Sequence, residues 1–184
     1  MTEEELLTLA AKAAAMVKYN PETGSATWLE KQGHIKDSIR WNARYAGKEC
    51  GTLDDNGYRR ISIRFNKRSP FRIRIHQLAW FITHGVMPSG EIDHINQNKL
   101  DNQIKNIRDV SRSINQRNGT RKGNNTSGIT GVVWHKQRQK WCAQCNLLGI
   151  HYHIGLFVSI EDADKAVRAF RSQHGFTETH GRIV

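Results

Sequence analysis

The sequence predicts an α+β protein, built from a few helices and short strands. Three observations predict it. Apolar residues recur at helical spacing near the N-terminus, apolar residues alternate with arginines over 58–75, and the last third has the pattern of three strands followed by a helix. We therefore expect a small mixed N-terminal region and a C-terminal three-stranded sheet with one helix, on either side of a central segment.

The charge is strongly positive and unevenly distributed. The 184 residues contain 28 Lys and Arg against 17 Asp and Glu, which gives a formal net charge of +11. Residues 31–75 carry a net +8 and residues 119–184 a net +5, whereas residues 76–118 carry only +1. Basic flanks around a nearly neutral centre indicate a polyanionic partner, most commonly nucleic acid, held at the flanks by its phosphates. The alternative is that these residues are simply a solvated surface.

Several protein classes are not expected. No apolar run approaches the roughly 20 residues that span a bilayer. The N-terminal MTEEELL is acidic where a secretory signal would be basic, and three cysteines are too few and odd in number for a disulfide framework. We therefore expect a cytoplasmic protein that is not secreted.

The N-terminal elements follow from local patterns. Residues 2–18 predict a helix, with Thr2 and Glu5 as a capping box and an alanine-rich buried stripe. A turn at 19–24 leads into a strand at 26–28.

Residues 58–65 and 71–75 predict a hairpin with a basic outer face, and 76–84 predict a short helix that ends near Gly85. Because such a face can contact phosphates, five arginines are candidate DNA ligands. They are Arg59, Arg60, Arg64, Arg72 and Arg74.

The C-terminal third begins with residues 118–128, which lack any large apolar side chain and predict a linker. Its Arg121 and Lys122 are candidates for a DNA-tracking arm, although a plain spacer is the default interpretation. Strands are expected within 131–145 and 149–157, and Ser159 with Asp162 predicts the start of a helix whose buried stripe is Ala163, Ala166, Val167 and Phe170.

The central segment carries the candidate chemistry. Asp93 and His94 lie between isoleucines, which predicts a strand end. A loop and strand around Asn106 follow, and then a helix capped by Ser111, which bears Asn115 and turns Ile114 inward. These side chains could converge on one site.

Such a set suits phosphodiester hydrolysis. A neutral histidine accepts a proton from water, and a carboxylate with an amide oxygen offers the hard ligands that Mg²⁺ prefers. The alternative interpretation makes Asp93-His94 a turn pair and the asparagines helix caps.

The segment resembles an HNH endonuclease, specifically the phage and intron-encoded homing branch. The matching stretches are Ile75-His76-Gln77-Leu78-Ala79-Trp80, Ile92-Asp93-His94-Ile95-Asn96, Asp101-Asn102, Asn106-Ile107-Arg108 and Asn115-Gln116-Arg117-Asn118. Residues 19–75 resemble the N-terminal part of these enzymes more loosely, notably at Pro21-Glu22-Thr23-Gly24 and from Gly47 to Tyr58.

The resemblance implies a ββα-metal finger and a role for each matching residue. His94 matches the general base, and Asn106 the asparagine that orients the histidine loop. Asp93 and Asn115 match the two ligands of one divalent metal. Because the third motif position is Asn115 rather than histidine, the resemblance is to the H-N-N branch, which implies Mg²⁺ or Mn²⁺ rather than zinc. His76 matches a position with a structural role.

Residues 127–175 resemble an AP2-type DNA-binding domain, on Gly128, Gly131-Val132, Lys140-Trp141-Cys142-Ala143, Gly155, Phe157 and the helix from Glu161 to Phe170. In that family a three-stranded sheet enters the major groove. By position the candidate DNA contacts are His135, Arg138, Lys140, Gln144 and Asn146, with Val133 near a thymine methyl or no base. At least one of Trp134 and Trp141 is expected in the core.

The Cys142-Ala143-Gln144-Cys145 motif invites a zinc interpretation. Residues three apart on a strand point to opposite faces, and no second such motif exists, so we expect no zinc site. His151 and His153 are expected at the surface or on phosphates.

Together these expectations describe a site-specific, metal-dependent endonuclease that acts on double-stranded DNA as a monomer, with no membrane or protein partner. The expected parts are an accessory DNA-binding region over 1–75, a nuclease domain over 76–118, a linker over 119–126 and an AP2-like domain over 127–184. The main alternative is a non-catalytic, sequence-specific DNA-binding regulator, and a weaker one is an RNA-binding protein.

Overall fold

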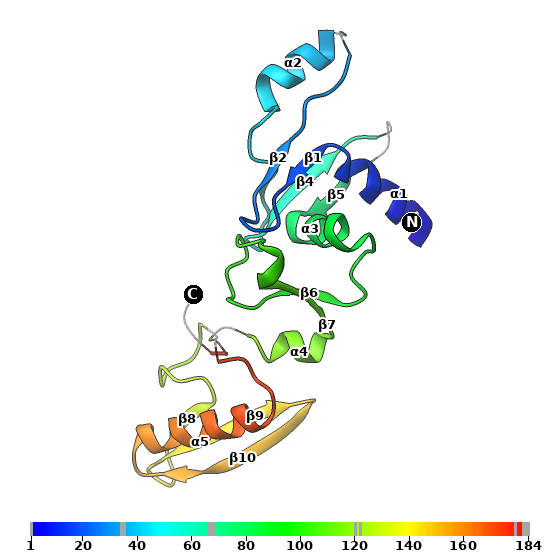
Figure 1. The fold of residues 1–184 in the computed structure, drawn as a ribbon. Helices are drawn as coiled ribbons and strands as arrows, with labels where there is room; N and C mark the ends of the chain where they lie inside the picture. The colour runs from blue at the N-terminus through cyan, green and yellow to red at the C-terminus, as the bar shows by residue number, and fades with distance from the viewer. Residues whose placement is uncertain are drawn as a thin grey trace. The chain divides into compact units, whose positions relative to one another are not determined.

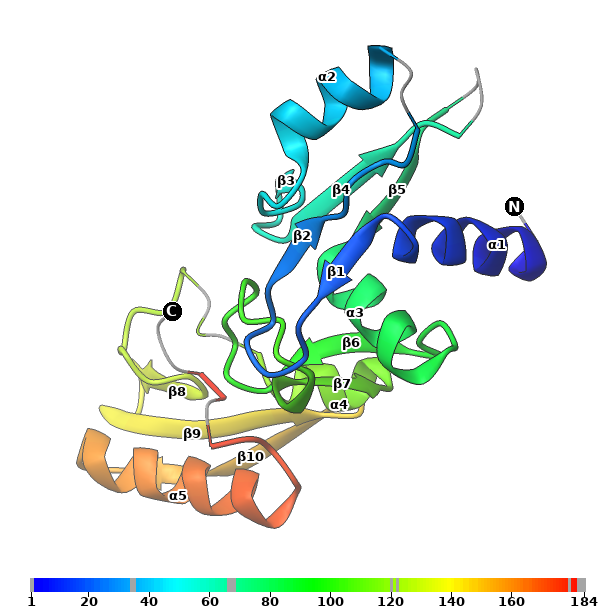
Figure 2. The same cartoon turned by 45° about the horizontal axis from the view of Figure 1, so that its top comes forward.

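The computed structural model describes residues 2–33, 36–65, 69–119, 121, 123–178 and 180–181 (Figures 1 and 2). The chain forms two compact units. The N-terminal unit comprises Met1–His94 and Asn98–Val110, and the C-terminal unit comprises Ile95–Gln97 and Ser111–Val184. The helices and strands of both units confirm the α+β expectation.

The first helix, α1 (Glu3–Ala14), begins at the expected cap. The Thr2 hydroxyl accepts from the Glu5 amide at 3.1 Å, and the Glu5 carboxylate accepts from the Thr2 amide at 2.9 Å. The helix ends four residues before the expected 18. The reason is that Val17 and Lys18, at the end of the expected helix, belong to β1 (Val17–Tyr19). This strand pairs with β2 (Ala26–Trp28) as an antiparallel hairpin.

The second sheet, in the order β3-β4-β5, contains the expected basic hairpin. Its strands are β3 (Thr52–Leu53), β4 (Arg59–Ile63) and β5 (Phe71–Arg74). Ile61 pairs with Ile73 on the buried face, and Arg60 pairs with Arg74 on the other face. The alternation therefore works as expected, with the isoleucines in the core and most of the arginines on the opposite side.

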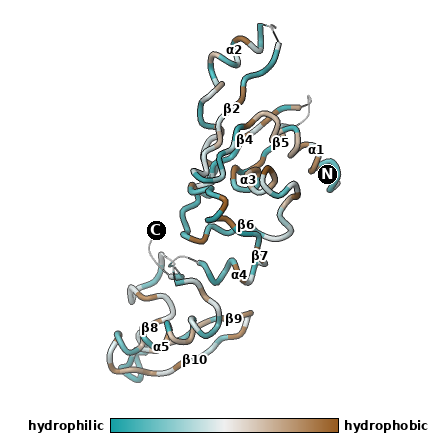
Figure 3. The backbone as a smooth tube through the Cα atoms, in the orientation of Figure 1, coloured by the Kyte–Doolittle hydropathy of each residue, from teal (hydrophilic) through white to brown (hydrophobic). Residues whose placement is uncertain are grey.

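The core of the N-terminal unit joins its first helix, this sheet and the helix α3 (Ile75–His84). Ala10 and Ala13 of α1 are fully buried, and Leu78 of α3 lies in the same cluster. Figure 3 shows hydrophobic colouring over much of α3. The helix ends at Gly85, as expected, because φ of +75° there stops it in the left-handed conformation.

The helix α2 (Lys36–Tyr45) was not expected from the sequence. Its only buried residue is Ser38, so it lacks the apolar stripe by which a helix is recognised. Trp41 packs on Trp28 at 5.6 Å between ring centroids, and the Asn42 amide bonds the Lys31 backbone in both directions.

The central hairpin has the expected form. Strand β6 (Glu91–His94) pairs with β7 (Ile107–Val110), which follows a single 3₁₀ turn, η1 (Ile104–Asn106). The register places Asp93 opposite Arg108 and His94 opposite Ile107.

The C-terminal unit contains the short helix α4 (Arg112–Gln116) and the expected three strands and helix. Strands β8 (Val132–His135), β9 (Lys140–Leu147) and β10 (Ile150–Phe157) form an antiparallel sheet, and α5 (Ile160–Gln173) packs on one face of it (Figure 2).

Particular residues bear out most of the expectations for this unit. The Ser159 hydroxyl caps α5 by accepting from the Asp162 amide, and Ala163 and Val167 are fully buried. Trp141 packs against the core, as expected for one of the two tryptophans. The inward orientation of Ile114 is wrong, because that side chain is 38% exposed on the one-and-a-half-turn α4.

No helix in the described part of the chain is both long and apolar enough to cross a membrane. The division into four functional parts stays a prediction.

Candidate active site

His94 is a buried histidine at the end of β6, with only 4% of its surface exposed. Its Nε2 lies 3.1 Å from Oδ1 of Asn102. The Asn102 amide nitrogen donates to the Leu100 carbonyl, which directs Oδ1 toward the ring. Because a carboxamide oxygen only accepts, Nε2 carries the hydrogen and the lone pair of the neutral ring is on Nδ1.

Two aromatic rings surround His94. The His76 ring meets it edge-on at 5.2 Å, and the Tyr58 ring lies 5.9 Å away. Two cations lie over the Tyr58 ring: Arg74 is 4.4 Å and Lys99 5.1 Å from its centroid. His76 is thus a packing partner of His94, which agrees with the structural role that the resemblance implies for it.

The surroundings keep both imidazoles neutral near pH 7. Burial is the main cause that lowers the pKa of His94 below its usual 6.5, although the bond to Asn102 and nearby carboxylates oppose it. Burial, together with the neighbouring His94 and Arg74, lowers the pKa of His76 to about 3. A neutral His94 is the form that accepts a proton.

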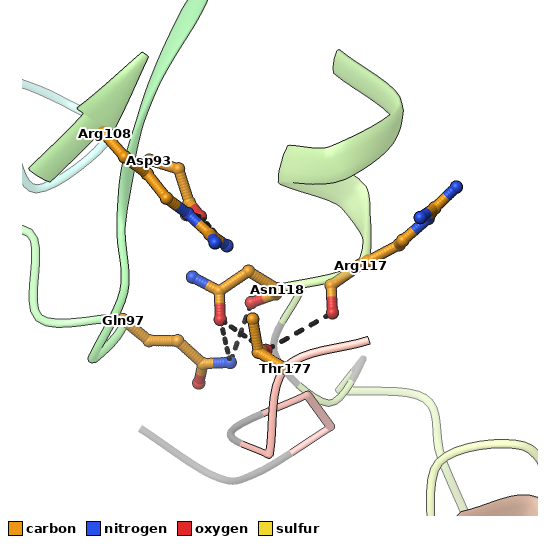
Figure 4. Close-up of polar contacts among 6 residues, drawn as sticks. All are labelled: Asp93, Gln97, Arg108, Arg117, Asn118 and Thr177. Carbon is orange, nitrogen blue, oxygen red and sulfur yellow. Dashed lines mark hydrogen bonds and ion pairs between the residues drawn. The ribbon is translucent and has the colours of Figure 1, made fainter. Parts of the chain in front are cut away.

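Asp93 is held by its partner on β7 (Figure 4). Its Oδ2 accepts from Nε and from a terminal nitrogen of Arg108, at 2.9 and 2.8 Å, and its side chain is 5% exposed. The carboxylate is therefore fixed in direction and balanced in charge by a guanidinium.

Residues 98–106 form a loop that is held from two sides. The Asn106 amide donates to the Asp101 carbonyl at 2.8 Å, so Asn106 fixes the backbone of this loop. From the other side, the Tyr19 hydroxyl donates to the Asn102 carbonyl at 2.7 Å, and the Ile104 amide donates to the Pro21 carbonyl. The β1–β2 hairpin thus supports the loop that positions Asn102.

Asn115 lies in α4 of the C-terminal unit, where it is partly buried. Three residues further on, the buried Asn118 takes part in several hydrogen bonds (Figure 4). The Gln97 amide donates to its carbonyl at 2.7 Å, and the Thr177 hydroxyl donates to its Oδ1 at 2.8 Å. This network ties the chain after α4 to the segment that follows α5.

The predicted arginines of the N-terminal unit fall into two groups. Arg59 pairs with Glu49 at 3.1 Å, and Arg74 pairs with Asp54 at 2.8 Å, so these two serve internal ion pairs. Arg72 and Arg64 are exposed, and Arg60 is half-buried opposite Arg74. Arg60, Arg64 and Arg72 are the members that form no ion pair within the described residues.

In the C-terminal unit, the predicted contacts lie mainly on the sheet face away from α5. Four of them are on two adjacent strands: His135, Lys140, Gln144 and Asn146. Arg138 is exposed in the β8–β9 turn. Arg121 donates to the Gly128 carbonyl at 2.6 Å, and Lys122 lies outside the described residues.

The two cysteines of the CxxC motif differ in their surroundings, as their spacing predicts. The Cys142 Sγ lies 3.3 Å from Nδ1 of His153, on the face away from α5. Cys145 alternates with it onto the helix side, near Arg171. Within the described residues, no three His, Cys, Asp or Glu side chains gather as a metal site would require.

Sequence reasoning missed the contacts of Asn102 and Arg108. Both residues belong to the matching stretches, yet nothing in their spacing shows that they touch His94 and Asp93. Arg108 could have been found from the hairpin register, since it lies opposite Asp93. Asn102 could not, because an irregular loop brings it to His94.

The site thus combines an antiparallel hairpin, an Asp93-His94 pair at the end of its first strand and an asparagine in the loop between its strands. A comparison of the sequence with known families agrees with this arrangement. Residues 74–117 match the family described as HNH endonuclease. The chain therefore contains an HNH endonuclease domain over these residues.

Two individual proteins are also similar. Protein 3.8 of Escherichia phage T7 is 30% identical over 103 residues, which span 55% of this chain and 85% of that protein. The chain belongs to the same family as Protein 3.8. A solved structure described as DNA binding and cleavage by the HNH homing endonuclease I-HmuI is 24% identical, with a TM-score of 0.38 over 55% of this chain. The chain spans about half the length of that structure, 50%.

Proposed function

We propose that the chain is a phage-encoded, metal-dependent DNA endonuclease that hydrolyses phosphodiester bonds at a specific site, as homing endonucleases do. The observation that carries the proposal is the buried, neutral His94 within the HNH segment, held through Nε2 by Asn102 and next to Asp93.

The proposed reaction uses His94 as the general base. Nδ1 of the neutral ring takes a proton from a water molecule, whose oxygen attacks the phosphorus of the scissile phosphodiester. The phosphorus–oxygen bond to the leaving sugar breaks, and that oxygen takes a proton from solvent. Asn102 keeps the ring in the tautomer that this step needs, and Asn106 fixes the backbone of the same loop.

The donor set suits a hard divalent cation. Asp93 and Asn115 would hold Mg²⁺ or Mn²⁺ through a carboxylate and an amide oxygen, the ligand types that such ions accept along with water. When bound, the ion would stabilise negative charge on the phosphate and on the leaving oxygen. Arg108 donates twice to Oδ2 of Asp93 and would hold this carboxylate in place.

DNA would be held by surfaces on both units. In the N-terminal unit, the exposed arginines of the β4–β5 hairpin would contact phosphates. In the C-terminal unit, the sheet face away from α5 would enter the major groove as an AP2-type domain does, which the order of three strands and a helix supports. We further propose that the protein acts as a monomer in the host cytoplasm.

A plasmid-relaxation assay tests the proposal. Supercoiled DNA that carries the region flanking the coding sequence should be nicked with Mg²⁺ or Mn²⁺ and left intact with EDTA. His94→Ala should lower the nicking rate by about 10²–10⁴-fold, because general-base catalysis contributes that much. Its gel-shift affinity should stay unchanged.

The matched control is His84→Ala, which removes an exposed histidine from α3 of the same unit and should nick normally. Retained nicking by His94→Ala would remove His94 from the base role. Duplex binding without nicking by the wild type would favour a regulator, and preference for a folded RNA competitor would favour an RNA-binding protein.

A further inference from the structure

Within the described residues, one face of helix α2 carries the contacts of Ser38, Trp41 and Asn42 with the rest of the N-terminal unit. Tyr45 lies on the same face, where its ring contacts Trp41 and lies 5.3 Å from the Arg44 guanidinium. Trp41 packs on Trp28 and Tyr45, and Asn42 bonds the backbone of Lys31.

The opposite side carries a stripe of three cations. Lys36, Arg40 and Arg44 follow one another at intervals of four residues and are exposed. Neighbouring cations are therefore separated by about 6 Å along the helix axis, which is about one helical turn. None of the three forms an ion pair within the described part of the chain. We call these residues the α2 stripe.

The α2 stripe works against the stability of its own helix. Like charges four residues apart repel each other, by roughly 0.2–0.5 kcal/mol per pair in isolated helices. Lys36 adds a positive charge to the first turn, where the helix dipole disfavours it. Asp37 in the first turn and Arg44 in the last turn suit the helix dipole and offset part of this cost.

We propose that the α2 stripe binds the phosphates of double-stranded DNA, as a contact separate from the active site. The inference rests on the proposed endonuclease function, and within the expected DNA-binding region over 1–75 it assigns a contact to a helix that the sequence did not predict. Charge complementarity identifies the partner: three aligned cations without counter-ions match a linear array of phosphates.

The position of α2 fits a contact that contributes affinity and not chemistry. One end of the β1–β2 hairpin, the turn before Gly24, supports the active-site loop at Asn102. Trp28, at the end of β2, packs on Trp41 of α2. Helix α2 therefore lies beyond the end of the hairpin that is farther from the loop (Figure 1).

The test compares two triple variants of the full chain by the salt dependence of duplex binding. The stripe variant is Lys36→Gln with Arg40→Gln and Arg44→Gln. The control variant removes the same charge elsewhere, by Lys12→Gln with Lys18→Gln and Lys165→Gln, all three exposed. Glutamine has nearly the helix propensity of lysine and arginine, so α2 should fold in both, which circular dichroism checks.

For the stripe variant, the slope of log K against log salt should fall by about 2.7, because each lost phosphate contact removes about 0.9. At 150 mM salt this corresponds to roughly a hundredfold weaker binding. The control should keep the wild-type slope, and both variants should nick saturating DNA at the wild-type rate.

If the wild type binds duplex DNA and the folded stripe variant shows the same slope of log K against log salt, this inference is wrong and the proposed function is unaffected. Equal loss of slope in both variants would overturn the inference as well, because it would show an effect of net charge only. A wild type that does not bind duplex DNA would overturn the proposed function and the inference together.

Discussion

Asn102 contacts the His94 ring, a contact that the sequence analysis did not predict. Family resemblance assigns the orienting role to Asn106, and the structure brings a second asparagine, Asn102, to the His94 ring. Asn106 holds the Asp101 carbonyl of the loop, whereas Asn102 holds the His94 ring itself. We propose Asn102 as a positioning residue for His94, the proposed general base.

Substitution of Asn102 should change both the rate and its pH dependence. Asn102→Ala removes the acceptor for Nε2, and nicking should slow by about 10–100-fold, the usual effect of losing such a supporting bond. Asn102→Asp puts a carboxylate next to the ring, which favours the protonated form and raises the pKa of His94.

The measurement for Asn102 is the pH–rate profile of nicking. Since burial lowers the pKa of His94, the wild-type rate should fall with acid only below pH 6.5. In Asn102→Asp this acid limb should move to higher pH. The control is Asn56→Ala, at an exposed turn residue of the same unit. If Asn102 had a purely structural role, the fall in nicking rate at low pH would occur at the same pH in Asn102→Asp as in the wild type.

At the scale of the element, the β1–β2 hairpin determines where the active-site loop lies. Gly24 has a φ of +72°, and a Cβ there would lie 2.5 Å from the Gln103 amide nitrogen and 2.6 Å from the Asn102 carbonyl carbon. The turn therefore approaches the loop backbone so closely that only glycine fits.

Gly24→Ala should displace the loop. We expect a loss of unfolding free energy of about 2 kcal/mol, within the usual range for a strained and crowded site, together with slower nicking. Gly47→Ala is the matched control, because Gly47 has a φ of +73° with nothing within 4 Å of its added Cβ. Denaturant unfolding and the nicking assay should separate the two variants, and equal effects would mean that backbone strain alone is responsible.

The sequence predicted those elements whose signals are local. The capping box at Thr2, the alternation of arginine and isoleucine in β4 and β5, and the Ser159 cap each depend on residues within a few positions. Helix α2 was missed because its single buried residue gives no apolar stripe. The contact between Asn102 and His94 was missed because it depends on an irregular loop whose shape is set by residues about 80 positions earlier.

At the scale of the whole molecule, each unit buries an uncharged histidine. His76 in the N-terminal unit has its pKa lowered to about 3, and His180 in the C-terminal unit has its pKa lowered to about 4, in both cases mainly by burial. An unfolded histidine titrates near 6.5, so the unfolded chain binds more protons between these values.

Stability should therefore fall as the pH is lowered from about 6.5 toward 4. The full contribution of both histidines is present above pH 6.5 and is lost on acidification, with each pKa unit equivalent to about 1.4 kcal/mol. Thermal unfolding at pH 7, 6, 5 and 4 measures this loss. His76→Gln should unfold at a lower temperature at pH 7 but show a weaker dependence on pH, and an unchanged dependence would contradict the assignment.

The support of the Asn102 loop by residues 19–24 limits how this HNH domain can be transferred to another protein. A chimera that contains only residues 76–118 would lack Tyr19, Pro21 and the turn at Gly24. Its His94 would then lack the contacts that hold the Asn102 loop in place. The smallest transferable block on the N-terminal side begins near residue 1, because α1 and the first hairpin share their interior with α3.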